Sequence, residues 1–293
     1  MAAPVLMLTG ASGFLGRRLL IGLTGPWRIV STSRSAEGPD TIALDLAEPD
    51  SLERAFEAVR PAAVVHTAAV SNPDACEREP ELAHRINVEA VMVLASLCAK
   101  LEARLVHFSS DLVFDGERGC YSEDDTARPL SVYGHGKLES EEAALSLCPG
   151  SVVLRVTNCY GRPLGGRISY LDQLRALLAA GLSVPGFVDQ WRSPTAADQL
   201  PEVVRCLLAK PDVRGVFHWG AADRTSRYEA ALTFCRVMGY DERLIRPARA
   251  ADERFLAARP RDTSLNSSRL ATALGLAPVR LQEGFAALKS TWD

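Results

Sequence analysis

Residues 8–19 read LTGASGFLGRRL and decide the fold class of this chain. Three glycines, Gly10, Gly13 and Gly16, stand three positions apart between an apolar run and an amphipathic segment. Glycine at a strand-to-helix turn lets the chain turn tightly, lets the backbone approach a pyrophosphate and lets the helix pack closely on the sheet. The phosphates would lie at the helix N-terminus, where free N–H groups favour negative charge. The spacing is GxxGxxG, a variant of the general fingerprint. It predicts a dinucleotide-binding turn, with a purely structural turn as the alternative.

Short apolar runs alternate with longer amphipathic segments along the first half of the chain. The expected strands are residues 4–10, 27–34, 41–46, 62–69, 103–110 and 151–157, and the expected helices are residues 13–23, 50–60, 80–101 and 132–147. Continuous apolar strands separated by helices are typical of a parallel sheet that is covered on both faces. Right-handed crossovers then produce a doubly wound sheet. We therefore predict an α/β fold with a Rossmann-type, doubly wound parallel sheet.

The second half of the chain predicts a smaller lobe. Past residue 157 the sequence becomes rich in glycine and proline, while the apolar segment 215–221 is expected to return to the sheet. We assign residues 1–157 to a nucleotide-binding domain, with residues 198–221 returning to it. The C-terminal, substrate-binding lobe is then formed by residues 158–197 and 222–293.

Composition narrows the classes of function. The net charge of -3 over 293 residues gives no basic excess that would favour a nucleic-acid partner. No apolar run reaches the roughly 18 residues of a membrane span, and the N-terminus lacks a basic signal-peptide segment. Seven widely spaced cysteines without a CxxC pair indicate reduced thiols in a cytoplasmic protein, and the histidine spacing predicts no metal site. His66 and His107 fall inside expected strands, so we predict satisfied core histidines rather than acid–base groups.

The second expected strand indicates the preferred cofactor. It ends in Ser33 and Arg34, whereas an NAD site commonly has an acidic residue near this point to hold the ribose hydroxyls. A guanidinium suits a 2′-phosphate through paired hydrogen bonds, so we predict NADP(H), with NAD(H) and a merely solvated arginine as alternatives. Asp45 and Leu46 follow the third strand and are placed to meet the adenine ring.

A second group of residues points to carbonyl reduction. Ser110 and Asp111 follow the apolar run 103–108, and Tyr133 precedes Lys137 by four positions in the next expected helix. Residues at i and i+4 share one face of a helix, so both side chains can point at a pocket beyond the strand ends. A ketone that accepts hydride needs a proton, which Tyr133 would donate, while Lys137 would lower the tyrosine pKa. Ser110 would polarise the substrate carbonyl, and Lys137 would also hold the nicotinamide ribose.

These motifs carry a family resemblance. The segments TGASGFLG (9–16), HTAA (66–69), SSDLVFDG (109–116) and YGHGK (133–137) resemble the extended short-chain dehydrogenase/reductases. The longer segment 109–141, together with DQWRSPT (189–195) and RPRDTSLNSSRL (259–270), is similar to the dTDP-4-dehydrorhamnose reductase family. The resemblance covers nearly the whole chain.

The resemblance implies a role for each matching residue. It gives Ser110, Tyr133 and Lys137 catalytic roles, and it gives Asn87 the ordering of a water in a proton relay. The cofactor contacts that we expect are Gly10, Ser12, Gly13, Phe14, Leu15, Gly16, Ser33, Arg34, Asp45, Leu46, Ala68, Ala69, Tyr133 and Lys137. The substrate contacts that we expect are Ser110, Asp111, Gln190, Arg192 and Thr195. Arg192 stands where many family members have glycine, which leaves the exact sugar open.

Three functions fit these expectations. The first is an NADPH-dependent reductase of a nucleotide-linked 4-keto-6-deoxy sugar, most specifically dTDP-4-dehydrorhamnose. The second is a non-catalytic regulatory subunit, because the beta subunit of methionine adenosyltransferase is similar to the same family. The third is a nucleotide-sugar epimerase or dehydratase, against which the Ser33–Arg34 strand end argues. The resemblance also implies a homodimer that pairs the helices expected at 80–101 and 132–147.

Overall fold

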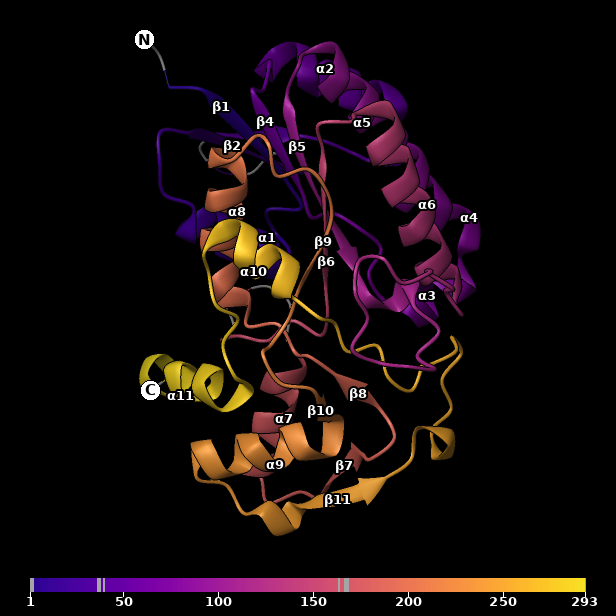
Figure 1. The fold of residues 1–293 in the computed structure, drawn as a ribbon, viewed down its shortest axis with the longest axis vertical. Coiled ribbons are helices and arrows are strands. Elements are labelled where there is room, and N and C mark those ends of the chain that lie inside the picture. Colours follow the sequence, from indigo (N-terminus) through magenta and orange to yellow (C-terminus); the bar gives the residue numbers. More distant parts are fainter. Residues whose placement is uncertain (1–2, 36–37, 39, 163, 166–168, 293) are drawn as a thin grey trace.

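The computed structural model describes residues 3–35, 38, 40–162, 164–165 and 169–292 (Figure 1). Its centre is a seven-stranded parallel sheet in the order β3-β2-β1-β4-β5-β6-β9. The strands are β1 (Val5–Thr9), β2 (Arg28–Ser33), β3 (Thr41–Ala43), β4 (Ala63–His66), β5 (Arg104–Ser110), β6 (Val152–Val156) and β9 (Gly215–Trp219). The order reverses between β1 and β4, which is where doubly wound sheets bind ligands. The predicted fold class is confirmed, and the segment around β9 does lie in the sheet.

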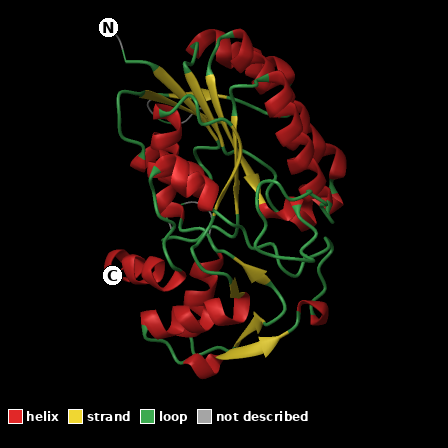
Figure 2. Cartoon of the chain, in the orientation of Figure 1, coloured by secondary structure: helices red, strands yellow, loops and turns green. Residues whose placement is uncertain are grey.

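Helices cover both faces of this sheet (Figures 1 and 2). One face packs on α1 (Phe14–Gly22), α8 (Leu200–Ala209) and α10 (Ser268–Leu274), and the other packs on α2 (Pro49–Val59), α5 (Ala90–Lys100) and α6 (Val132–Leu147). Alternate residues of a strand point to opposite faces. Leu8 therefore joins the α1 side of the core and Met7 joins the α5 side, and both are fully buried.

The helix expected at 80–101 has a different internal structure from the prediction. It begins as α4 (Pro80–His84), passes through a π turn at Arg85–Glu89 and continues as α5, after the short helix α3 (Pro73–Arg78). By length and composition alone, the run Pro80–Lys100 could cross a membrane, but core helices pass the same test. Here one side of the run, including Val91 and Leu94, is buried against the sheet, whereas Leu82 and Met92 are exposed.

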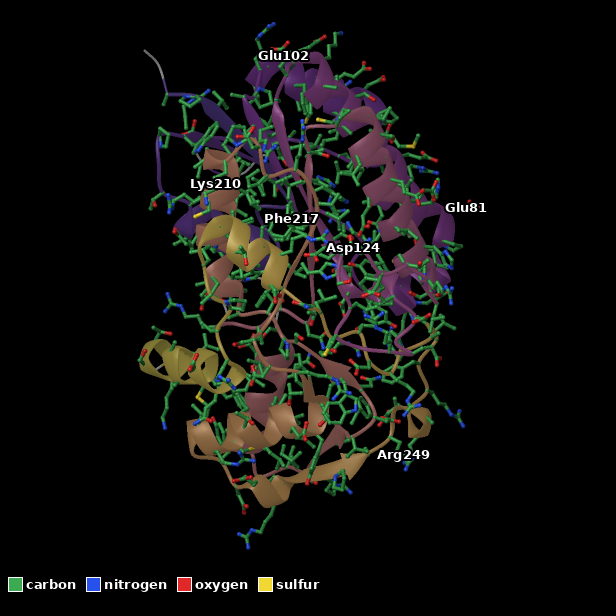
Figure 3. All side chains as sticks on the ribbon, in the orientation of Figure 1. Glu81, Glu102, Asp124, Lys210, Phe217 and Arg249 are labelled. Atoms are coloured by element: carbon green, nitrogen blue, oxygen red, sulfur yellow. The ribbon has the colours of Figure 1, made fainter. Side chains whose placement is uncertain are left out.

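The smaller lobe has its own core. Its strands form two pairs, β7 (Val184–Phe187) with β11 (Ile245–Ala248) and β8 (Trp191–Arg192) with β10 (Thr225–Ser226). Its helices are α7 (Tyr170–Ala179), α9 (Arg227–Met238) and α11 (Leu281–Trp292). Short 3-10 turns occupy Asp111–Val113, Ala197–Gln199, Glu242–Leu244 and Ala250–Asp252. Leu174, Phe234 and Phe285 meet in the lobe core, while charged side chains such as Arg249 lie outside (Figure 3).

The C-terminal segment returns from the lobe to the main domain. Leu265 forms a bridge with Tyr121, in the loop that follows β5. Asp262 lies so close to Gly119 that any Cβ there would overlap its carboxylate, and Gly119 has a φ of 73°. This contact needs glycine for both space and conformation. The tail thereby fixes the loop that begins at Ser110, which is a predicted catalytic residue.

Candidate functional site

A cavity of about 650 Å³ opens beyond the carboxyl ends of β1, β2 and β4. It lies at the point where the strand order reverses, which is the expected place for a ligand. Twelve of the residues predicted to bind the cofactor line it, namely Gly10, Ser12, Gly13, Phe14, Leu15, Gly16, Ser33, Arg34, Asp45, Leu46, Ala68 and Ala69. One concave surface therefore brings together four segments that are far apart in sequence.

The glycine loop shows why its residues cannot carry side chains. Gly10 has a φ of 73°, and a Cβ there would lie 2.7 Å from the backbone nitrogen of Ala68. A Cβ on Gly16 would overlap the carbonyl oxygen of Gly10, whereas one on Gly13 would lie 3.1 Å from that oxygen. Gly13 caps α1 without any side-chain hydrogen bond, so the first N–H groups of the helix stay free for a ligand. This cradle fits a dinucleotide pyrophosphate.

The residues that we expect to bind the adenosine part of the cofactor lie at the rim of the cavity. Arg34 is exposed just past the end of β2. Asp45 is held in place, since its carboxylate accepts a hydrogen bond from Ala47 N at 2.9 Å and its N–H donates to Ser51 Oγ at 3.0 Å. A guanidinium at this rim fits a 2′-phosphate. The contacts themselves remain predictions.

Several residues of this cavity were missed at the sequence level. Thr67, Val70 and Asn72 follow β4 and were within reach of the rule that ligands bind beyond strand ends. Cys159 also lines the cavity and follows the end of β6, so the same rule could have identified it. Tyr170, at the N-terminus of α7, comes from the lobe, and no local pattern indicates that a lobe helix would close the cavity.

Asn87 lies in the π turn and has a structural partner. Its side-chain oxygen accepts a hydrogen bond from Val70 N at 2.9 Å, and its amide nitrogen donates to Val70 O at 3.0 Å. This pair fixes the loop that lines the cavity after β4. The side-chain amide is thus committed to the loop, and the ordering of a relay water stays a prediction for this residue.

The predicted catalytic residues meet where β5 faces the start of α6. Ser131 caps α6 by accepting a hydrogen bond from Gly134 N at 3.1 Å. A Cβ at Gly134 would overlap the carbonyl oxygen of Leu112, so glycine allows the helix to approach the loop after Ser110. This close approach brings the Tyr133 hydroxyl beside the Ser110 side chain, whose hydroxyl also donates to Asp111 Oδ1 at 3.3 Å.

The environment of Tyr133 differs from the expectation. Burial raises its pKa above the ordinary value, and the hydrogen bond with Ser110 partly opposes the rise. We expected Lys137 to lower this pKa. Instead, Lys137 Nζ donates to Phe108 O at 2.7 Å and lies 3.3 Å from His107 Nε2. The ammonium is thus committed to β5, so its effect on the tyrosine is not the dominant one in this structure.

Lys137 is itself an unusual lysine. Its side chain is 3% exposed, and burial lowers its pKa to about 8, against the opposing effect of Glu141. Glu141 forms a buried ion pair with Arg155 at 2.6 Å and accepts a hydrogen bond from Ser109. Charged and polar groups therefore continue beneath α6 for a full turn past the lysine.

Asp111, Arg192 and Thr195 have internal partners, whereas the buried side-chain nitrogen of Gln190 has no hydrogen-bond partner among the described residues. Asp111 pairs with Arg192 at 3.2 Å and accepts from Thr263, while the remaining Arg192 donors reach the carbonyl oxygens of residues 191, 260 and 261. Thr195 donates to Trp219 O at 3.0 Å. Gln190 is 2% exposed. Arg192 would have to give up these bonds to reach a diphosphate, so its role in substrate binding remains a prediction.

Other lobe residues offer better chemistry for a nucleotide. Arg227 lies over the ring of Tyr170 at 4.6 Å and over that of Phe187 at 5.7 Å. Phe187 contacts Phe255 edge to face at 5.9 Å, and Arg259 lies over the Phe255 ring at 4.8 Å. Tyr170 also lines the cavity, so this arginine–aromatic cluster begins at the cavity and runs into the lobe. Guanidiniums can pair with phosphates, and aromatic faces can stack on bases.

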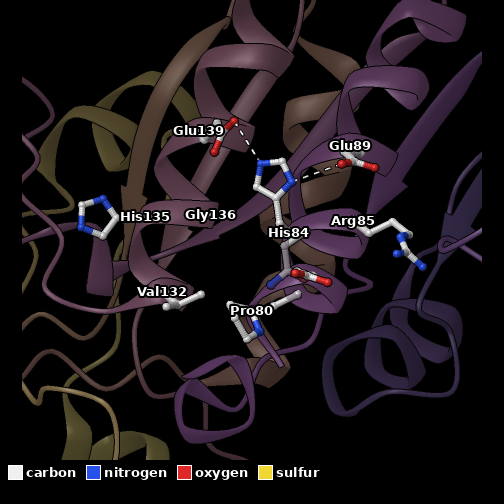
Figure 4. Close-up of a pocket in the computed structure, with 11 residues that line it drawn as sticks. Pro80, His84, Arg85, Glu89, Val132, His135, Gly136 and Glu139 are labelled. Atoms are coloured by element: carbon white, nitrogen blue, oxygen red, sulfur yellow. Dashed lines mark hydrogen bonds and ion pairs between the residues drawn. The ribbon is translucent and has the colours of Figure 1, made fainter. Parts of the chain in front are cut away.

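A second cavity of about 580 Å³ lies between α4 and α6 (Figure 4). His84 stands at its centre, with one ring nitrogen 3.3 Å from Glu89 and the other 3.3 Å from Glu139. Asn87 is the predicted site residue found in this lining. Among the residues described, no group of three or more His, Cys, Asp or Glu could hold a metal ion.

Comparisons with known proteins agree with this geometry. A probable low-salt glycan biosynthesis reductase, Agl14, from Haloferax volcanii is 30% identical over 98% of this chain and 97% of its own length. The methionine adenosyltransferase 2 subunit beta of Bos taurus is 31% identical over 91% of this chain and 81% of its own length.

Solved structures share the whole fold. A dTDP-4-dehydrorhamnose reductase from Clostridium acetobutylicum superposes with a TM-score of 0.89 at 25% identity, covering 98% of this chain and 99% of that one. Other structures with this fold are complexes with NADP or NAD. The family model described as RmlD substrate binding domain matches residues 4–291, and the chain belongs to this family.

Proposed function

We propose that this protein is an NADPH-dependent reductase of a nucleotide-linked 4-keto-6-deoxy sugar, with dTDP-4-dehydrorhamnose as the favoured substrate. The observation that carries the proposal is the neighbouring pair of Ser110 and Tyr133, with Lys137 one helical turn further on. The pair lies at the carboxyl edge of the sheet that also holds the glycine-lined cavity. The similarity to a glycan biosynthesis reductase and to a dTDP-4-dehydrorhamnose reductase supports it.

The residues suit the proton side of such a reaction. When bound, NADPH supplies the hydride, and the substrate carbonyl oxygen then needs a proton. Tyr133 is protonated at neutral pH and can donate this proton as the general acid, although burial raises its pKa and thereby makes it a weaker acid than a free tyrosine. Ser110 donates a hydrogen bond to the same oxygen and polarises the carbonyl. Lys137 donates to Phe108 O in this structure and would have to turn toward Tyr133 to stabilise the phenolate that remains after the transfer.

The cofactor proposal rests on the cavity rim. Arg34 is exposed past the end of β2, where a 2′-phosphate would lie, and supports NADP(H) over NAD(H). The arginine–aromatic cluster of Tyr170, Phe187, Arg227, Phe255 and Arg259 supports a nucleoside diphosphate as the other half of the substrate. We also propose a cytoplasmic location and a homodimer.

A regulatory subunit is the second candidate function. The observation that favours it is the 31% identity with the beta subunit of methionine adenosyltransferase 2 from Bos taurus. The present site geometry suits both candidates, because a cofactor-binding cavity serves a regulator as well as an enzyme. An epimerase or dehydratase is less favoured, since such enzymes hold NAD tightly and the end of β2 offers Arg34 in place of an acidic residue.

One experiment separates these functions. The purified protein is given NADPH and a panel of nucleotide-linked 4-keto sugars, and NADPH oxidation is followed beside the Tyr133→Phe variant. Turnover with one sugar, lost in the variant while NADPH binding persists, supports the reductase and names its substrate. Unchanged turnover in Tyr133→Phe would refute the role of the tyrosine. Tight NADPH binding without turnover on any sugar would overturn the reductase proposal in favour of the regulatory subunit.

A further inference from the structure

Two buried histidines lie side by side under the helix that carries Tyr133 and Lys137. Thr9, His66 and His107 stand at one level of the sheet on the neighbouring strands β1, β4 and β5. The two imidazoles are 1% and 0% exposed, and their rings stack with centroids 5.3 Å apart. His66 Nδ1 lies 2.7 Å from Thr9 Oγ1.

Within the described ranges, only one ring nitrogen of each histidine has a hydrogen-bond partner, whereas we expected both rings to be fully hydrogen-bonded. His66 Nε2 and His107 Nδ1 have no hydrogen-bond partner among the residues that the structure describes. Buried polar atoms without partners are uncommon in folded proteins and call for an explanation. The strand pattern identified both residues as buried, but the unpaired nitrogens depend on contacts between strands.

The contacts of His107 Nε2 constrain its proton. This nitrogen lies 3.0 Å from Ser140 Oγ and 3.3 Å from Lys137 Nζ. Ser140 Oγ donates its only proton to Lys137 O at 2.7 Å, so it can only accept from the imidazole. An ammonium can only donate. A protonated Nε2 can therefore donate to Ser140 Oγ, but it cannot accept a hydrogen bond from a charged Lys137. An unprotonated Nε2 can accept a hydrogen bond from the Lys137 ammonium.

We propose that His107 is a positioning residue for Lys137, and that its tautomer follows the charge of the lysine. While Lys137 is an ammonium, His107 carries its proton on Nδ1 and accepts from Lys137 at Nε2. When Lys137 becomes an amine, one lysine proton has passed to Nε2, the Nδ1 proton has left for bulk water, and Nε2–H donates to Ser140. The imidazole is neutral before and after, and the pair loses one proton. This inference rests on the proposed role of Lys137.

The surrounding charges allow this exchange. The titratable and charged groups near Lys137 are Tyr133 and Glu141 on its own helix and the two histidines on β4 and β5, while Arg155 on β6 is paired with Glu141. Burial lowers the pKa of His66 to about 3 and that of His107 well below its ordinary value, so neither ring is charged near neutrality. The lysine is the group that changes charge, at a pKa of about 8.

The consequence is a lysine that is held but not permanently charged. Desolvation alone drives a buried lysine toward the amine. The Phe108 carbonyl and the bare Nε2 of His107 both accept from the ammonium and favour it. His107 thereby keeps the lysine charged and fixed in direction near neutral pH.

Nuclear magnetic resonance of the full-length protein labelled with ¹⁵N-histidine tests the inference directly. The His107 signals are assigned by their loss in His107→Gln. We expect the Nδ1–H tautomer at pH 6.5 and the Nε2–H tautomer near pH 10. An Nε2–H or doubly protonated ring at pH 6.5, or the same tautomer at both pH values, would overturn the proposal. This result does not depend on turnover, so it stands apart from the test of the reductase.

Variants then separate positioning from packing. His107→Leu removes the acceptor, so the alkaline midpoint of the pH–rate profile should fall by about one pH unit. His107→Gln restores an acceptor near Nε2 and should restore the midpoint. Val204→Ala is the control for packing, because Val204 is fully buried in the core on the opposite face of the sheet from α6. Equal shifts in Val204→Ala and His107→Leu, or no shift in His107→Leu, would refute a specific role.

Discussion

Replacing Glu141 by glutamine should destabilise the protein far more than a conservative change on a helix normally does. Glu141 is 2% exposed and receives Arg155 Nε at 2.9 Å and Nη2 at 2.6 Å, together with the Ser109 hydroxyl. Glutamine keeps the size of the side chain and removes its charge. The guanidinium of Arg155, whose side chain is 6% exposed, then stays buried without a counter-charge.

The magnitude follows from this burial. Breaking a buried ion pair by removing one partner costs about 3–5 kcal/mol, because the remaining charge is uncompensated. At about 2–4 °C per kcal/mol, the midpoint of thermal unfolding should fall by about 6–20 °C. The control is Glu139→Gln on the same helix, since Glu139 is 52% exposed and pairs only with His84 among the described contacts. Exposed changes of this kind stay within about 0.5 kcal/mol.

Wild type, Glu141→Gln and Glu139→Gln are compared by circular dichroism. Urea denaturation gives the free energy of unfolding, and thermal denaturation gives the unfolding midpoint. The double variant Glu141→Leu with Arg155→Met removes both charges and should be more stable than Glu141→Gln alone. A loss below about 1 kcal/mol in Glu141→Gln, or equal losses in Glu141→Gln and Glu139→Gln, would refute the reasoning. Since Ser109 adjoins the predicted catalytic serine, NADPH oxidation measured at 20 °C shows whether the site is also disturbed.

Three further predictions rest on single contacts. Gly16→Ala should abolish NADPH binding and lower stability, because its Cβ would overlap the Gly10 carbonyl oxygen. Gly13→Ala places its Cβ 3.1 Å from that oxygen, so this variant should fold but bind NADPH more weakly. Fluorescence titration with NADPH measures binding by both variants. Arg34→Ala should weaken NADPH binding about tenfold and leave NADH binding nearly unchanged, which a comparison of the two dissociation constants checks. Lys137→Met should show a stability difference from wild type that depends on pH. The folded-state pKa of about 8 lies below the ordinary lysine value of 10.5, so the unfolded wild type binds more protons between these values. The stability of wild type relative to the variant should therefore rise by about 3 kcal/mol from pH 8 to pH 10.5, and a constant difference across this range contradicts the burial argument.

Local sequence patterns determined much of this protein. The glycine spacing predicted the turn and the cavity around Gly10, since a close backbone approach excludes side chains wherever it occurs. Alternation of apolar strands and helices predicted the parallel sheet. The order of Ser110 and Tyr133 predicted that these two would lie side by side, because the carboxyl end of one strand and the start of the next helix are neighbours in a doubly wound fold.

Contacts between distant segments decided the rest. The family resemblance made Arg192 an expected substrate contact, but the structure pairs it with Asp111 across 81 positions of sequence. Lys137 was expected to face Tyr133, yet it donates to the Phe108 carbonyl and contacts His107 on β5. A pattern of residue types carries no information about which donor meets which acceptor once both are buried.

The division has one physical reason. Backbone conformation and burial follow from short-range sterics and periodicity, so Gly10, Gly16 and the apolar strands could be interpreted from the sequence. Protonation and hydrogen bonding follow from distances between elements, and these depend on how the whole chain packs. The sequence by itself therefore determined the fold class and the residues of the glycine turn and the strand ends, but not those that the lobe adds to the cavity. Only the tertiary structure decided which way Lys137 points and which charges it meets.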